Sequence, residues 1–300
     1  MKKIIAILLF LPLTLHAESL FEMGLHGGVA GWNAQPVYVN TQIGWNGGFH
    51  LYYNYLSPRV IGLRTGLTID RHQAGFGKTN YQDSYSTIDV ENEKMDISYT
   101  IGQLSEKQTI WSVGIPMQVA FAKKHFLFLI GAKAMFPIGN NWHQSVQHAA
   151  LSVYYPAYDN RVEESFPLAA SRDFEMQNNG KMTLPKVQWW LSAELNYAFE
   201  LNNWARNYRS YLIVGAYFDY CFTTLTPPHS SAESLIMLTD TRDGFPLQRV
   251  LTPVAEGNRQ GRKLVKDGKL FDVGLKISYA ISPYDPHKAA FKACNCLSDY

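Results

Sequence analysis

This chain of 300 residues lacks the features that mark several common classes of protein. Beyond its N-terminal segment, no stretch approaches the roughly 18 consecutive apolar residues that a membrane-spanning helix requires. Charged residues make up only 17% of the chain, the formal net charge is +2, and no run of Lys and Arg is interleaved with aromatic residues. The sequence therefore gives no reason to expect helical membrane spans or a nucleic-acid partner.

Cysteine is also scarce, because the chain contains only Cys221, Cys294 and Cys296. The Cys-Asn-Cys spacing is poor for a local disulfide and lacks the second pair of ligands that a structural zinc site needs. We therefore expect no metal and no other cofactor. An odd cysteine in an exported protein can bridge to a partner, so Cys294 and Cys296 are candidates for a crosslink through the C-terminal tail, with unpaired thiols as the alternative.

The first 17 residues have the pattern of a secretory signal peptide. Lys2 and Lys3 give a basic start, an apolar run covers residues 4–15, and the small residue Ala17 precedes polar residues. This apolar run is too short to cross a bilayer as a helix. We predict a signal peptide over residues 1–17, cleaved on export; a buried N-terminal helix is the alternative interpretation.

Aromatic residues, at 14% of the chain, lie mostly in segments where apolar and polar residues alternate. A period of two is typical of a β-strand with two different faces. Eight such segments follow one another: Phe21–Val29, Ile43–Tyr55, Ile61–Ile69, Trp111–Phe121, Phe126–Phe136, Val187–Phe199, Leu212–Phe222 and Phe271–Ile281.

The connections between these segments alternate between long and short. The long ones are residues 30–42, 72–108, 137–186 and 223–269, and the short ones are 56–58, 122–125 and 201–209. Short periplasmic turns and longer outer loops are typical of outer-membrane barrels. The sequence thus predicts an all-β fold, an eight-stranded antiparallel up-and-down transmembrane β-barrel with long extracellular loops. We expect it to span residues 18–282, with a short periplasmic tail at 283–300.

Isolated charges fall on the polar face of the predicted strands, where Gly, Ala and Ser predominate. Because eight strands enclose a lumen just wide enough for side chains, mixed acidic and basic residues are expected to pair across it. We predict a plugged barrel and not an open pore. The predicted lumen charge network consists of Glu22, Arg64, Lys133, Glu194, Asp219, Asp272 and Lys276.

Aromatic residues gather near both ends of the strands, as expected for the two interfaces of a membrane. The predicted girdle comprises Trp45, Trp111, Trp189 and Phe271 at the outer end, and Tyr53, Phe121, Tyr197 and Tyr279 at the periplasmic end. A soluble lipocalin-type barrel is the alternative, since it also alternates but turns its apolar face inward. The small residues of the polar face and the two aromatic bands favour the membrane barrel.

Several strands resemble those of known barrel families. The pair "WSVGIPMQVAFAKKHFLFLIGAKAMF", together with "LSAELNYAF", "LIVGAYFDY" and "FDVGLKISYAI", resembles strands of the OmpA-like and PorT-like outer-membrane β-barrel families. The resemblance implies an integral protein of the outer membrane of a Gram-negative cell. It marks a barrel and not an activity.

Two classes of function are compatible with such a barrel. One is a structural, adhesive or envelope-assembly role, with outer-membrane lipid around the barrel and an envelope protein partner at the tail or outer loops. The other is a lipid-modifying enzyme, which needs a Ser, a His and usually a carboxylate at the outer rim. His143, Ser145 and His148 share one loop, and Asp70 with His72 closes the third strand, but no recognisable motif frames them. We therefore name no catalytic residue and favour the first class.

Overall fold

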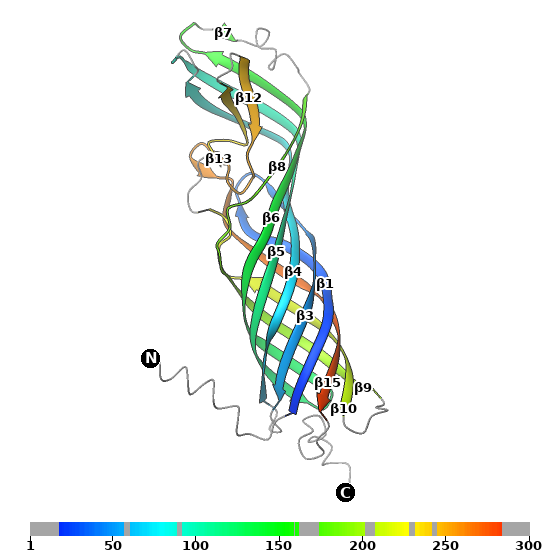
Figure 1. Cartoon of the computed structure of the whole chain (residues 1–300). Coiled ribbons are helices and arrows are strands. Elements are labelled where there is room, and N and C mark those ends of the chain that lie inside the picture. Colours follow the sequence, from blue (N-terminus) through cyan, green and yellow to red (C-terminus); the bar gives the residue numbers. More distant parts are fainter. Residues whose placement is uncertain are drawn as a thin grey trace, which may run out of the picture.

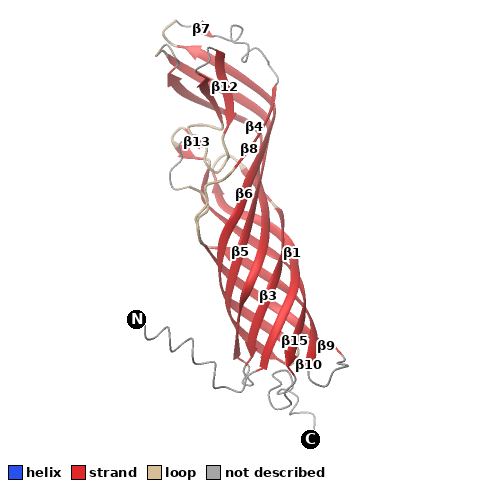
Figure 2. Cartoon of the chain, in the orientation of Figure 1, coloured by secondary structure: helices blue, strands red, loops and turns tan. Residues whose placement is uncertain are grey.

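The computed structural model describes residues 18–56, 61–88, 92–158, 160–161, 174–201, 208–227, 232–241 and 245–283. All regular structure in these ranges is β-strand (Figure 2). The helix search over the same residues finds none that is long and apolar enough to cross a membrane. The predicted signal peptide and both tail cysteines, Cys294 and Cys296, lie outside the described residues.

Within the described ranges, fifteen strands follow one another (Figure 1). They are β1 (Glu18–Pro36), β2 (Asn40–Gln42), β3 (Gly44–Leu56), β4 (Ile61–Ile88), β5 (Lys94–Lys123), β6 (Phe126–Tyr155), β7 (Asn160–Arg161), β8 (Phe174–Gly180), β9 (Gln188–Leu201), β10 (Tyr208–Cys221), β11 (Ile236–Thr241), β12 (Phe245–Leu251), β13 (Asn258–Arg259), β14 (Arg262–Lys263) and β15 (Val265–Pro283).

Eight of these strands close into a barrel in which every neighbour is antiparallel. The order around the ring is β1, β3, β4, β5, β6, β9, β10 and β15, and β15 pairs with β1 to complete it. Strands adjacent in the ring are also consecutive ring strands in the sequence, so the topology is up-and-down. This confirms the predicted fold class.

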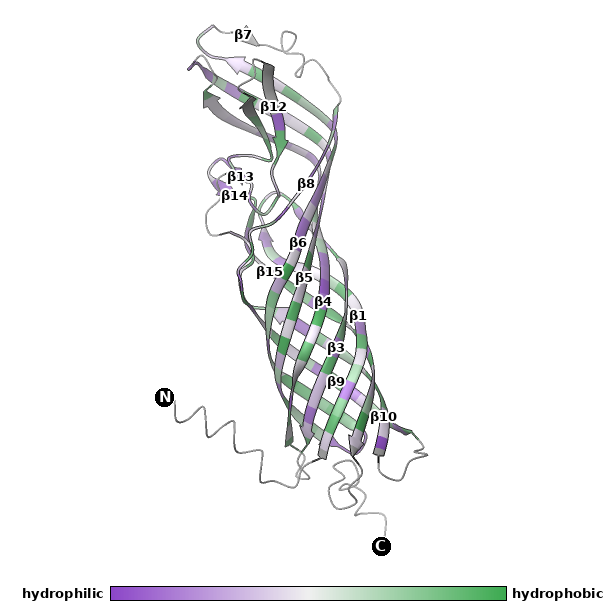
Figure 3. Cartoon of the chain, viewed as in Figure 1, coloured by the Kyte–Doolittle hydropathy of each residue, from purple (hydrophilic) through white to green (hydrophobic). Residues whose placement is uncertain are grey.

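The alternating pattern turns the apolar residues outward. On β5, Ile115 and Met117 are exposed while Gln118 is buried, and on β15 Leu275 has 69% of its surface exposed. Figure 3 shows the same alternation along the lower strands, where hydrophobic residues recur at every second position. Such a wide apolar outer surface suits lipid and not water, so the soluble lipocalin-type alternative is not supported.

The long strands extend far beyond the apolar belt, which corrects the predicted loop boundaries. Residues 72–108 and the first part of 137–186 were expected to be loops, but β4, β5 and β6 run for 28, 30 and 30 residues. The period of two continues in this region, with Ile97 and Tyr99 buried and Ser98 exposed. Its outward face is polar, because it stands in water above the membrane. The alternation there signals a water-facing sheet.

We call this upper region the platform: the upper parts of β4, β5 and β6, with β8, the β11–β12 hairpin and the β13–β14 segment. Figure 1 shows these elements stacked above the barrel mouth at the loop end. The three long strands share one irregularity, because their pairing skips Asn80, Gly102 and His148. Asn80 and His148 have positive φ values of 53° and 54°. This shared irregularity shifts the inward face of β5 from Ile101 to Leu104.

Buried residues form two apolar clusters that are separated by a polar layer. One cluster closes the turn end of the lumen and consists of Leu20, Leu56, Ala120, Ala122, Leu127, Leu129, Ala198, Tyr211, Ile213 and Ala280. The other fills the mouth of the barrel and the platform, with Trp32, Trp190, Met135 and Leu270 among its members. The polar layer between the two clusters holds the predicted charges.

Candidate functional site

All seven residues of the predicted lumen network lie inside the barrel. Their exposed fractions range from 1% for Arg64 and Asp272 to 6% for Asp219. Each occupies an inward position of its strand. Because side chains alternate along a strand, the residues before and after it belong to the outer face. The structure brings six of them into two ion-paired groups and joins the seventh, Asp272, to a histidine.

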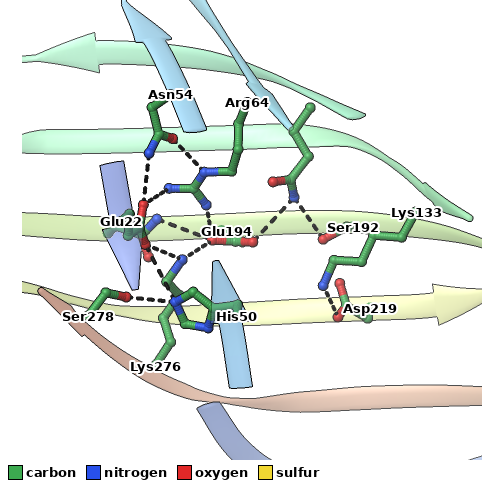
Figure 4. A network of polar contacts seen from close by, with 12 residues as sticks. Glu22, His50, Asn54, Arg64, Lys133, Ser192, Glu194, Asp219, Lys276 and Ser278 are labelled. Atoms are coloured by element: carbon green, nitrogen blue, oxygen red, sulfur yellow. Dashed lines mark hydrogen bonds and ion pairs between the residues drawn. The ribbon is translucent and has the colours of Figure 1, made fainter. Parts of the chain in front are cut away.

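The central group is a quartet of two carboxylates and two cations (Figure 4). Arg64 on β4 lies between Glu22 and Glu194, with Nη2 2.7 Å from Glu22 Oε2 and Nη1 2.7 Å from Glu194 Oε2. Lys276 on β15 closes the group, with Nζ 2.7 Å from Glu194 Oε2 and 3.0 Å from Glu22 Oε1. The quartet is balanced in formal charge, as burial of ions at this depth requires.

Neutral side chains add hydrogen bonds to the quartet. Asn54 accepts a hydrogen bond from Arg64 Nε at 2.6 Å and donates to Glu22 Oε2 at 3.0 Å. Gln118 donates to Ser192 at 2.9 Å and to Glu194 Oε1 at 3.3 Å. Together with the ion pairs, these bonds link β1, β3, β4, β5, β9 and β15 across the lumen, so the quartet holds opposite walls of the barrel together.

Three further carboxylates are paired closer to the loop end. Lys133 Nζ lies 2.6 Å from Asp219 Oδ2. His72 Nδ1 lies 2.7 Å from Asp272 Oδ2, and His26 Nε2 lies 2.8 Å from Asp70 Oδ1. His50 Nε2 lies 3.7 Å from Glu22 Oε1. The five carboxylates of the polar layer thus face three permanent cations and three histidines.

Three histidines also belong to this network, although only the charged residues were predicted to form it. His26 and His50 follow outward-facing apolar residues, and His72 continues the inward parity of Arg64 and Asp70 on β4; this parity is the signal that places all three. Asp70 and His72, which we considered for an outer-rim catalytic site, are instead buried in the lumen on β4. There each is bonded to a different partner, so they do not act as a pair at the rim.

All eight predicted girdle residues point outward from the barrel. Trp45, Trp111 and Trp189 are 48%, 45% and 42% exposed near the loop end. At the turn end, the ring of Tyr53 lies 5.1 Å from that of Phe21, and the ring of Tyr197 lies 5.1 Å from that of Phe126. Phe271, Phe121 and Tyr279 complete the outward-facing set. The two bands border the apolar belt on either side.

Within the platform, a buried polar cluster attaches the segment that leads into the β11–β12 hairpin to the long strands β4 and β5. Asp83 Oδ2 accepts hydrogen bonds from Tyr81 at 3.0 Å, Tyr99 at 3.2 Å and Ser234 at 2.8 Å. Arg259 Nε lies 3.5 Å from Asp83 Oδ1. Burial, together with the nearby Asp83 charge, raises the pKa of the Tyr99 hydroxyl, which therefore stays a donor. The cluster fixes the fourth long connection to β4 and β5.

A second buried carboxyl holds the segment that follows β12. Glu106 accepts hydrogen bonds from Gln108 at 2.5 Å, Gln144 at 2.8 Å and the backbone N–H of Val254 at 2.7 Å. Gln144 also donates to the carbonyl of Thr252 at 3.0 Å. Burial raises the pKa of Glu106 to about 7, because only neutral donors offset the loss of water around the carboxylate.

The residues considered for catalysis do not form a recognisable site. His143 and Ser145 lie on the outward face of β6, and His148 lies in the shared irregularity. Cys221 is buried at the end of β10, where its thiol donates to the carbonyl of Thr223. Over the described residues, no group of three or more His, Cys, Asp and Glu side chains is arranged to hold a metal ion.

No protein-family model and no curated protein matches the chain. Two crystal structures of Ail, the attachment invasion locus protein of Yersinia pestis, are similar to it at 11% identity, one of them in complex with the heparin analogue sucrose octasulfate. They cover 87% and 88% of this chain and 98% of Ail, with TM-scores of 0.25 and 0.27. A Pseudomonas aeruginosa FadL homologue matches at 7% identity over 89% of this chain and 90% of its own, with a TM-score of 0.17. At these TM-scores the likeness carries no argument about function, and the fold assignment rests on the closed ring of strands itself.

Proposed function

We propose that this protein is a sealed outer-membrane barrel that anchors a rigid extracellular platform and has a structural and adhesive role at the cell surface. The observation that carries this proposal is the continuous filling of the molecule along its axis. Three groups of buried side chains follow one another along the axis: an apolar cluster at the turn end, the ion-paired layer, and the apolar cluster at the mouth. A barrel filled in this way is suited to anchoring and not to transport.

The placement in the outer membrane is supported by the outward apolar belt, the two aromatic bands and the resemblance of several strands to OmpA-like and PorT-like barrels. With the short turns on the periplasmic side, the platform stands outside the cell. Its hairpin is fixed to the long strands through Asp83 and Tyr99. Rigid display of loops is typical of recognition surfaces, because little conformational entropy is lost on binding.

The adhesive role is tested by replacing the hairpin and leaving the barrel intact. A variant in which residues 235–251 are replaced by a short Gly-Ser linker removes β11 and β12. Cells that display the full chain are expected to be retained on immobilised extracellular-matrix proteins or on a lawn of the same strain, and cells with the variant are expected to lose this retention. Equal surface amounts and heat-modifiable mobility of the two proteins are the control. Equal retention by both would contradict the adhesive role.

A further inference from the structure

A single arginine lies among the aromatic residues on the outer surface of the barrel at the loop end. Arg71 on β4 points outward, and its Cζ lies 3.9 Å from the centre of the Trp45 ring and 5.9 Å from that of Trp111. Trp45 comes from β3 and Trp111 from β5, so the two strands that flank Arg71 hold the guanidinium in place. Stacking on rings fixes its plane and leaves its edge free to donate hydrogen bonds.

The hydrogen bonding of Arg71 is incomplete. Nη2 donates to Gln73 Oε1 at 3.0 Å. Nη1 is buried against its surroundings and has no hydrogen-bond partner among the described residues. The guanidinium has further N–H donors at Nε and Nη2, which are not among its buried unpartnered atoms, and these remain for an acceptor supplied from outside the chain. An anion with several oxygens meets this need best, because a guanidinium donates in parallel to such groups.

The surface above Arg71 has the charge that an anion requires. The outward positions on β4, β5 and β6 just above the Trp residues carry Gln73, Thr109, Lys107, Asn141 and His143. None of these side chains is acidic, and together they offer a second permanent cation and several neutral donors. Glu106, which precedes Lys107 on β5, is acidic, but its side chain is turned inward and buried. The strip is therefore positive on the side that faces the surroundings.

The surface below Arg71 identifies the molecule that carries the anion. Ile69, two residues before Arg71 on the same face of β4, is 46% exposed, and Phe49 on β3 is 40% exposed. Both belong to the apolar belt that faces acyl chains. A molecule in contact with Arg71 from outside thus has an apolar surface below it and a positive strip above it. A lipid with a phosphate at the interface fits both parts, whereas a free anion fits only the upper one.

We propose that Arg71, held between Trp45 and Trp111, binds the phosphate of an outer-leaflet lipid whose acyl chains lie along Ile69 and Phe49. The N–H groups of Arg71 at Nε and Nη2 donate to phosphate oxygens, and Lys107, two outward positions beyond Trp111 on β5, adds positive charge above the site. The inference rests on the membrane placement made in the proposed function. It does not depend on the adhesive role, because it concerns the barrel wall and not the hairpin.

The test compares two lipids that differ only in the phosphate. Native mass spectrometry of the full chain in detergent micelles is used to titrate dioleoyl phosphatidic acid and dioleoylglycerol. We expect the wild type to bind the phosphorylated lipid about tenfold more tightly, which corresponds to about 1.4 kcal/mol. R71Q is expected to abolish this preference. K123Q, which removes an outward cation at the opposite end of β5, is the matched control and is expected to retain it.

Heat-modifiable mobility shows whether each variant is folded. If R71Q fails to fold, W45L provides the second test, because loss of the stacking ring is expected to weaken the preference while the cation remains. Equal binding of the two lipids by the wild type, or an unchanged preference in R71Q, overturns the proposal. Displacement of the phosphorylated lipid by an equal concentration of inorganic phosphate assigns the site to a free anion and overturns it as well.

Discussion

The quartet in the lumen predicts a strong energetic coupling between Lys276 and Glu194. Lys276 Nζ contacts both Glu194 and Glu22, at 2.7 Å and 3.0 Å, and all of these groups are almost fully buried. K276M leaves two carboxylates to share Arg64 alone. Removing one member of a buried ion pair costs about 3–5 kcal/mol, because the remaining charge is neither solvated nor paired. This is a large part of the roughly 5–15 kcal/mol that stabilises a folded protein.

The double variant E194Q/K276M separates the pairing from the packing. It removes one charge of each sign and leaves Glu22 paired with Arg64 at 2.7 Å. We therefore expect its loss of unfolding free energy to be smaller than the sum of the losses in the two single variants. The difference, which is the coupling energy, is expected to be about 2 kcal/mol, towards the upper part of the range for groups in contact. The exposed pair of Lys94 and Asp96, 3.9 Å apart, serves as the matched control and is expected to couple by less than about 1 kcal/mol.

The assay is urea-induced unfolding of the barrel in lipid vesicles, followed by tryptophan fluorescence and by heat-modifiable mobility. The wild type, both single variants and the double variant complete one thermodynamic cycle. Additive effects of K276M and E194Q would refute the reasoning, because they would mean that water and not the opposite charge stabilises each group. A hydrated lumen would also undermine the sealed barrel.

Three other predictions concern the platform and the lipid face. Because the pKa of Glu106 is raised to about 7 from an ordinary value near 4.5, its stabilising contribution is complete below pH 4.5 and is lost as the pH rises through 7. The rate of amide hydrogen exchange at Val254 should therefore rise between pH 6 and 8 by more than the intrinsic exchange rate does. E106Q should remove this additional rise. An unchanged additional rise in E106Q would exclude Glu106 as its cause. L275R places a charge on a lipid-facing position that is 69% exposed, and is expected to cost about 2–4 kcal/mol in vesicle unfolding; a neutral effect would argue against lipid contact there. D83N weakens the attachment of Ser234 and Arg259, so limited proteolysis should cleave residues 232–238 faster while the barrel stays intact; unchanged cleavage would show that the apolar contacts alone hold the hairpin.

Much of the barrel could be predicted from the sequence, because the constraint on each strand is local. A residue such as Leu275 faces lipid and its neighbour Lys276 faces the lumen, and a period of two is enough to assign both faces. The parity that places Glu22 and Arg64 inside also predicts that they lie near one another in a narrow lumen. The sequence does not predict which charges pair, since partners such as Arg64 and Glu194 are 130 residues apart in the chain.

The platform could not be predicted in the same way. Its long strands alternate as the barrel strands do, but their outward residues, such as Ser98 and Thr100, are polar because they face water. The series of outward-facing apolar residues therefore stops before the strands themselves end. The contacts that attach the fourth long connection join residues about 150 positions apart, as in the bonds of Asp83 with Ser234 and of Glu106 with Val254. No short-range periodicity encodes such pairs.

The central claim is that the barrel is sealed by its own side chains, and single-channel recording tests it most directly. The pure full-length protein is reconstituted into a planar lipid bilayer, and its folded state is verified by heat-modifiable mobility. The proposed sealed barrel predicts that insertion produces no steady channel current in the wild type. A large and steady conductance from the pure protein would contradict the sealed barrel.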